Sequence, residues 1–296
     1  MFERVDDYLD TLKNELSGAD PATVQDALAD AEEHLRTGLG QLLKTDPDLT
    51  ESAALQRVVE EYGSPGEVAA AYRQIEERVS PPLAPPAQKD DRSLASRFFG
   101  VFVEPRAYAS LFYMLFSMIT GIVYFTWATT GLSMSVGFLV LIIGLPFVAL
   151  FLLSVQGIAL VEGRIIEALL GVRMPRRPLF SKKHLGLWAR FKALITDKLS
   201  WTTILYMILQ LPLGTLYFTL FLTMFIFGLA GIATPVLQFG FDQPLVYWNG
   251  RSYFLPGWLI PITVIVGIIW LFLTMHLAKA IGRRHAAYAK ALLVRD

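Results

Sequence analysis

Apolar residues at the start of the chain follow a helical period. Over residues 1–79 they recur every three or four positions in four separate stretches, the pattern of amphipathic helices that share one core. Asp20 precedes Pro21, and Ser64 precedes Pro65. Both pairs are helix-start signals, because the first side chain caps free amides and proline fits the first helical turn. The pattern predicts a small four-helix module.

The remainder of the chain is apolar over lengths that suit a membrane. Residues 107–161 and 199–241 contain no charged side chain, whereas a spanning helix needs about 20 apolar residues. The first run therefore holds two spans and the second holds one, and a fourth follows. The predicted spans lie near residues 108–128, 134–154, 201–232 and 258–276. Cytoplasmic amphipathic helices are predicted near residues 157–170, 184–198 and 277–294.

A proline-rich stretch separates the two regions. Residues 80–92 hold four prolines among thirteen positions, a composition typical of an extended linker. The predicted fold class is therefore all-α. A cytoplasmic four-helix module (1–79) is joined by the linker (80–92) to a four-span helical membrane domain (93–296).

The charges are unevenly distributed, although 26 Lys and Arg balance 26 Asp and Glu overall. Residues 1–92 carry a net charge of −11 and residues 93–296 carry +11. Nine Lys and Arg lie within residues 156–199 and five within the C-terminal tail, whereas Arg251 is the only basic residue of the two opposite loops. Cytoplasmic loops are the basic ones. Both termini are therefore predicted to be cytoplasmic.

The membrane domain contains an internal repeat. Tyr113, Gly121 and Tyr124 have counterparts 93 positions later, at Tyr206, Gly214 and Tyr217. Six of the fourteen positions from 113 to 126 are identical to those from 206 to 219. Both copies would enter the membrane from the inside, which predicts parallel repeats about an axis along the membrane normal.

Three groups of residues are candidate functional sites. The loop before the fourth span suits a ligand site or an interfacial cap through Asp242, Tyr247, Trp248, Asn249 and Arg251. A basic amphipathic stretch suits docking of the acidic module or contact with anionic lipid through Lys182, Lys183, Arg190 and Lys192. At the inner boundary of the second span, Glu162, Arg164 and Glu167 are expected to pair with one another and anchor the span.

The sequence lacks the patterns of catalytic and cofactor sites. There is no cysteine, which excludes disulfides, thiolate metal sites and a cysteine nucleophile. No Walker A, GxGxxG, HExxH or GxSxG motif occurs. The predicted spans also lack the ionisable groups that intramembrane catalysis or transport requires. We therefore expect no enzymatic activity, no cofactor, no metal site and no direct binding of nucleic acid.

The N-terminal module resembles the HAAS family of small helical signalling domains over residues 1–79. The residues that carry the likeness are the opening Tyr8-Leu9-Asp10-Thr11-Leu12, the centre Glu33-His34-Leu35 and the block YGSPGEVAAAY from Tyr62 to Tyr72. The resemblance implies a cytoplasmic bundle attached to a membrane region and often encoded beside a PadR-type transcription regulator. It implies no catalytic residue.

Residues 104–296 resemble the sensor domain found at the membrane end of some bacterial histidine kinases. The likeness is spread over Glu104-Pro105-Arg106, Tyr113, Gly121, Tyr124-Phe125, Gly144-Leu145-Pro146, Val161-Glu162-Gly163-Arg164, Ala168–Val172, Leu277-Ala278 and Ala289–Leu292. The resemblance implies a domain that senses a cue, with no kinase activity of its own.

Together these features predict a non-enzymatic, sensor-like membrane protein that couples a membrane or envelope cue to a soluble cytoplasmic partner. The expected partners are the lipid bilayer and, through residues 1–79, a PadR-type regulator or a separate kinase or signalling protein; a homo-oligomer is compatible with the sequence. Two alternatives stay open, a small permease or membrane subunit of a transporter, and a membrane-anchored structural scaffold.

Overall fold

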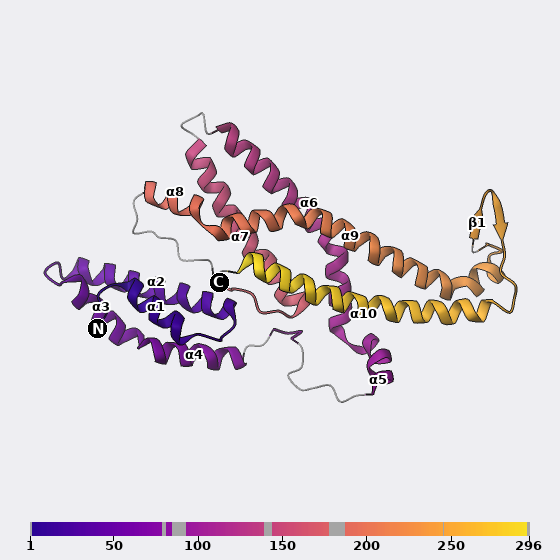
Figure 1. The fold of residues 1–296 in the computed structure, drawn as a ribbon, viewed down its shortest axis with the longest axis horizontal. Helices are drawn as coiled ribbons and strands as arrows, with labels where there is room; N and C mark the ends of the chain where they lie inside the picture. The colour runs from indigo at the N-terminus through magenta and orange to yellow at the C-terminus, as the bar shows by residue number, and fades with distance from the viewer. Residues whose placement is uncertain are drawn as a thin grey trace. The chain divides into compact units, whose positions relative to one another are not determined.

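The computed structural model describes residues 2–78, 81–84, 93–138, 144–177, 187–244 and 246–294 (Figure 1). Most of the predicted linker, residues 80–92, lies outside these ranges. The chain divides into two compact units. The first comprises Met1–Ala84, Thr130–Tyr206 and Tyr288–Asp296, and the second comprises Pro85–Thr129 and Met207–Ala287.

The N-terminal helices α1 to α4 form a bundle with its own core (Figure 1). They are α1 (Val5–Glu15), α2 (Pro21–Thr45), α3 (Glu51–Tyr62) and α4 (Pro65–Arg78). The side chains of Tyr8, Leu12, Leu16 and Leu35 are completely buried in this core. The helical period of the sequence therefore predicted the four helices and their shared core.

The helix starts in the bundle follow from the capping residues. Asp20 accepts a hydrogen bond from the Ala22 amide at 2.9 Å, directly before Pro21. At the start of α4, the Glu67 carboxylate accepts from the Ser64 amide at 2.8 Å and from the Ser64 hydroxyl at 2.7 Å. Gly63, with a φ of +110°, ends α3 in a backbone conformation that favours glycine. Both predicted caps are confirmed.

Four helices among the described residues are long and apolar enough to cross a membrane. They are α6 (Pro105–Phe138), α7 (Gly144–Leu170), α9 (Lys198–Pro235), which the π-helical turn η2 (Val236–Gly240) extends, and α10 (Ile260–Leu293). Three shorter elements complete the helices: α5 (Leu94–Phe99), η1 (Gly100–Val103) and α8 (Leu187–Thr196). Charge and hydropathy therefore predicted the number of membrane-length helices that the described residues contain.

The long helices differ from the predicted spans in length and in position. Residues 134–138, predicted as the start of the second span, belong to α6, and α7 begins at Gly144. Helix α6 continues to Phe138 through the polar residues around position 130, where the Thr129 hydroxyl donates to the Phe125 carbonyl at 2.7 Å and so stays within the helix. The amphipathic stretches 157–170 and 277–294 are the ends of α7 and α10 and not separate helices. Helix α8 forms within the stretch predicted at 184–198.

In the second unit, α9 and α10 run as a closely packed antiparallel pair that ends in a small hairpin (Figure 1). A Cβ atom added to Gly267 would lie 2.8 Å from the Gly228 carbonyl oxygen, so only glycine permits this approach. The strands β1 (Val246–Trp248) and β2 (Arg251–Tyr253) pair antiparallel, with Val246 opposite Tyr253. Asn249 and Gly250 turn the hairpin with φ of 49° and 74°.

The internal repeat lies where α6 crosses α9. A Cβ atom on Gly121 would lie 2.6 Å from the carbonyl oxygen of Gln210, and one on Gly214 would collide with the carbonyl oxygen of Ser117. Gly121 and Gly214 are repeat partners, and so are Ser117 and Gln210, since both pairs are 93 residues apart. The two copies therefore make equivalent contacts with each other, whereas the predicted axis along the membrane normal stays a prediction.

Candidate regulatory interface

A short non-helical segment follows α7 within the first unit. Gly171 ends the helix with a φ of +68°, and its Cα lies so close to the Leu83 carbonyl that a side chain would collide with it. Residues 172–176 then adopt no helix or strand. Pro175 has no amide hydrogen and disfavours a helix. The backbone amides of Arg176 and Arg177 therefore have no helical acceptor and are available to other groups. We call residues 173–177 the arginine segment, since they contain Arg173, Arg176 and Arg177.

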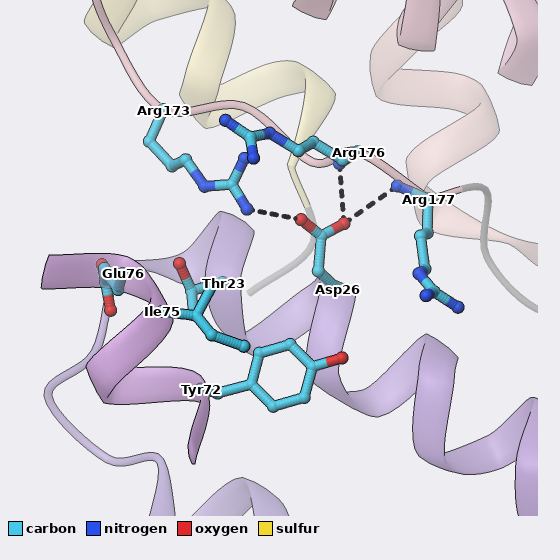
Figure 2. Close-up of a pocket in the computed structure, with 8 residues that line it drawn as sticks. All are labelled: Thr23, Asp26, Tyr72, Ile75, Glu76, Arg173, Arg176 and Arg177. Atoms are coloured by element: carbon cyan, nitrogen blue, oxygen red, sulfur yellow. Dashed lines mark hydrogen bonds and ion pairs between the residues drawn. The ribbon is translucent and has the colours of Figure 1, made fainter. Parts of the chain in front are cut away.

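Asp26 of α2 accepts hydrogen bonds from these two backbone amides (Figure 2). Its Oδ1 accepts from the backbone amide of Arg176 at 2.7 Å and from that of Arg177 at 2.9 Å. Its Oδ2 accepts from the Arg173 guanidinium at 2.8 Å. One carboxylate of the bundle is therefore held by two consecutive backbone amides and a guanidinium.

The environment of Asp26 contains opposing electrostatic effects. The residue is only 4% exposed, and this burial raises the pKa of its carboxyl above the ordinary value. The two amides and Arg173 act in the opposite direction, because they stabilise the ionised form. These donors compensate part of the cost of removing the carboxylate from water.

Glu167, in the last turn of α7, forms ion pairs with three arginines. It pairs with Arg164 at 3.0 Å, with Arg173 at 3.3 Å and with Arg176 at 2.8 Å. Arg173 thus bridges Asp26 of the bundle and Glu167 of α7. The Arg164 guanidinium also donates to the Arg176 carbonyl at 3.0 Å. The end of α7 and the arginine segment form one network that reaches the bundle through Asp26.

Two further ion pairs join the bundle to basic residues of the same unit. Arg177 pairs with Asp30, and Lys290 near the end of α10 pairs with Asp20. Asp30 also accepts from the Tyr72 hydroxyl at 2.9 Å. Both pairs are partly exposed and contribute about 0–1 kcal/mol each, so the buried contacts of Asp26 are the stronger part of the interface.

A pocket of about 230 Å³ opens beside Asp26 (Figure 2). Its lining residues come from α2, α4 and the arginine segment: Thr23, Asp26, Tyr72, Ile75, Glu76, Arg173, Arg176 and Arg177. The Thr23 side chain is 3% exposed, and its hydroxyl has no hydrogen-bond partner among the described residues. Three arginines and Asp26 therefore make much of the pocket wall polar and charged.

The three residues predicted to pair at the inner boundary of the second span take part in two different contacts. Arg164 and Glu167 pair as part of the network described above. Glu162 is completely buried and accepts a hydrogen bond from the Tyr206 hydroxyl of α9 at 2.7 Å. Because α7 continues through residue 162, this carboxyl group lies inside the helix and not at its end.

The residues predicted for docking lie beyond the arginine segment. Lys182, Lys183 and the side chain of Arg190 are outside the described part of the chain. Lys192 is exposed on α8. Docking at these residues stays a prediction, whereas the bundle contacts described above use Arg173, the backbone amides of Arg176 and Arg177, the Arg177 side chain and Lys290.

The candidate outer loop forms the β1–β2 hairpin and its approach. Tyr247, Trp248, Asn249 and Arg251 are exposed in the hairpin, and Asp242 is exposed before it with a φ of 50°. The Tyr247 hydroxyl donates to the Gln243 side chain at 3.3 Å. Two exposed aromatic rings beside one arginine suit the interface of a membrane, and a ligand role for this loop stays a prediction.

Sequence reasoning did not single out Asp26 or the arginine segment. A signal for Asp26 existed, because Ala22, Asp26 and Ala29 share one face of α2 opposite the core stripe, and all three are buried. Small residues on both sides of an acid indicate a helix face that another segment of the chain can approach closely. A signal for the segment existed as well, because prolines at 175 and 178 flank two arginines and keep their amides out of a helix. Within the described residues, no cluster of His, Cys, Asp and Glu is arranged to hold a metal ion.

Comparison with known families assigns both parts of the chain. The model of a family described as Putative sensor matches residues 113–293, more than half of the chain. The model of a family described as HAAS matches residues 7–71. Both resemblances seen in the sequence are thereby confirmed, in the predicted order. No curated protein and no solved structure gives a significant match.

Proposed function

The chain belongs to the Putative sensor family and carries a HAAS module before that region, and from this premise we propose that it is a non-enzymatic signalling protein of the bacterial cytoplasmic membrane. Its four-span domain receives a membrane or envelope cue. Its bundle is held on the arginine segment in one state and is released to a soluble cytoplasmic partner in the other. The partner is a PadR-type regulator or a separate kinase, and both termini are cytoplasmic.

The observation that carries the proposal is the way in which Asp26 is bound. A bundle attached to the membrane domain through the linker alone would not need an acid that is buried in a contact with that domain. Here one carboxylate joins the bundle to a segment that begins directly after a membrane-length helix. A movement of α7 changes the position of Glu167 and, through Arg173, the donors around Asp26. The contact therefore couples a helix of the sensor region to the signalling module.

The contact is also weak enough to be reversible. It contains one buried carboxylate and two partly exposed ion pairs, and the net gain of a buried pair is small because both charges lose water. Docked and released states that differ by a few kcal/mol are populated together and respond to a cue. The permease and scaffold alternatives are not favoured by any of these contacts.

Binding of the partner to the full-length protein tests this proposal. The affinity of a purified PadR-type regulator is measured for the wild type, Asp26→Ala and Glu33→Ala, all in lipid nanodiscs. Removal of Asp26 raises the released fraction and tightens the apparent affinity in proportion. Glu33 is an exposed acid of the same helix, and its replacement leaves the affinity unchanged. Equal affinities for the wild type and Asp26→Ala contradict the proposal.

A further inference from the structure

The donors around Asp26 form a general site for an oxyanion. Two consecutive backbone amides converge on Oδ1, and a guanidinium converges on Oδ2. Consecutive amides outside a helix create a small electropositive concavity, and arginine supplies a planar pair of donors that matches carboxylate and phosphate alike. Nothing in this donor set is specific for an aspartate of the bundle.

We propose that the arginine segment is a binding site for a phosphate group, and that Asp26 occupies it as an internal substitute in the docked state. The phosphate belongs either to the headgroup of an anionic lipid or to a free phosphate ion. Its binding displaces Asp26 and releases the bundle. This inference rests on the proposed function and names the chemical class of its cue.

The charges of the segment support a ligand that is more negative than one carboxylate. Arg164, Arg173, Arg176 and Arg177 surround the site. In the docked state their charges face Asp26, Asp30 and Glu167. When the bundle leaves, its two aspartates leave with it, and among the described partners Glu167 stays paired with three of the four arginines. The released segment is therefore strongly basic and attracts an anion.

The place of the segment in the chain brings it within reach of lipid phosphates. It begins three residues after Leu170, the last residue of α7, and α7 is long and apolar enough to span a membrane. An extended chain covers at most about 3.5 Å per residue, so Arg176 lies within about 20 Å of the helix end. Headgroups at the surface of an anionic membrane attract basic residues close to the ends of spanning helices. The acidic bundle and the lipid phosphates thus compete for the same donors.

The pocket beside Asp26 supplies a route for this exchange. It is lined by all three arginines of the segment (Figure 2). Half of the Arg177 side chain and a third of the Arg176 side chain are exposed, so an incoming phosphate meets them before Asp26 has left. A phosphate therefore binds first in the pocket and then in place of the carboxylate.

The first experiment measures docking in the full-length protein. The chain has no cysteine, so cysteines introduced at Thr37 of α2 and Ala189 of α8, both exposed, carry a donor and an acceptor dye. Energy transfer is recorded in nanodiscs of phosphatidylcholine, in nanodiscs of phosphatidylglycerol, and in phosphatidylcholine with inorganic phosphate at constant ionic strength. Asp26→Ala in phosphatidylcholine defines the released state. If Asp26→Ala leaves the transfer unchanged, the docking contact in the proposed function is wrong.

The lipid and phosphate arms test the inference itself. The wild type in phosphatidylglycerol shifts toward the energy transfer of Asp26→Ala. A shift caused by lipid alone assigns the site to a headgroup, and a shift caused also by inorganic phosphate assigns it to phosphate in general. If Asp26→Ala changes the transfer but neither phosphate source shifts the wild type, release stands and the phosphate site is wrong.

A second measurement identifies the binding residues. Retention of phosphatidylglycerol is measured by mass spectrometry for Asp26→Ala and for the same chain with Arg173→Gln or Arg57→Gln. Loss of Arg173 weakens retention by about tenfold, the usual effect of removing one charge-assisted hydrogen bond. Arg57 is an exposed arginine of α3 and serves as the control, so its loss leaves retention unchanged. Equal retention by both double variants, with unchanged melting temperatures, overturns the assignment to the arginine segment.

Discussion

Two acids of the bundle illustrate how surroundings decide what a carboxylate does. Glu67 lies at the surface, and the hydrogen bonds from the Ser64 hydroxyl and amide hold its pKa below the ordinary value. Asp26 is buried, and burial raises its pKa although amides and an arginine oppose the shift. The first residue stabilises a helix end, whereas the second links the bundle to the arginine segment.

Replacing Ser64 by alanine removes the cap of α4. The Glu67 amide loses the Ser64 oxygen, 3.4 Å away, and the Glu67 carboxylate loses the Ser64 hydroxyl. Ser64→Ala is expected to lower the free energy of unfolding of residues 1–79, which have their own core, by about 1 kcal/mol. Thermal unfolding followed by circular dichroism measures the change. Ser17→Ala, at an exposed position, is the control, and an equal effect of both substitutions contradicts the assignment of the cap.

The lowered pKa of Glu67 predicts how its contribution depends on pH. A carboxyl whose pKa is lower in the folded than in the unfolded chain stabilises the fold above the unfolded pKa, here about 4.5. That stabilisation is lost as the pH falls through the folded value. The difference in unfolding free energy between the wild type and Glu67→Gln is therefore expected to be largest near neutral pH and to shrink below pH 4.5. Urea unfolding of the bundle at neutral and acidic pH measures it, and a difference that grows with acidity refutes this account.

At the scale of elements, the close crossing of α6 and α9 depends on two glycines. Glycine inside a helix ordinarily lowers stability by about 1 kcal/mol relative to alanine. At Gly121 and Gly214 the sign is reversed, because an added methyl group would meet backbone of the other helix. The close approach of the two helices therefore requires glycine at both positions.

Alanine substitutions test this crossing directly. Gly121→Ala and Gly214→Ala are each expected to destabilise the full-length protein by about 1–3 kcal/mol, since the helices must move apart. Gly157 of α7 has open space around its Cα, so Gly157→Ala leaves stability unchanged or raises it. Melting temperatures of the purified protein in one detergent provide the comparison. If all three variants melt together, the crossing does not contribute to stability.

For the whole molecule, the distribution of basic residues predicts the orientation in the membrane. A cysteine at Ser252 in the exposed hairpin should react with a membrane-impermeant reagent added to intact cells, because the loop contains one basic residue only. A cysteine at Ser52 of the bundle, also exposed, should react only after the cells are opened. Labelling of Ser52→Cys in intact cells would place the bundle outside and contradict the proposed topology.

Local chemistry was sufficient to predict the helices of the bundle and the number of membrane-length helices among the described residues. Asp20 with Pro21 and Ser64 with Glu67 satisfy amides within three residues of themselves, so their effect on the backbone does not depend on distant parts of the chain. The spans likewise follow from apolar runs whose length matches a membrane. The ends of the spans were less predictable, because a polar residue such as Thr129 forms a hydrogen bond within α6 and does not end the helix.

The pairing of Asp26 with the arginine segment could not be derived in the same way. Asp26 and Arg176 are 150 positions apart, and the N-terminal 92 residues offer 20 acids to 17 basic residues of the remaining chain. Net charges of opposite sign predict attraction between the two regions and leave the partners undetermined, since charge acts over distances larger than one side chain. The choice depends on short-range geometry: a close-approach face on α2, a glycine that ends α7, and amides that a proline keeps outside the helix. Only the folded chain brings these three together around one carboxylate.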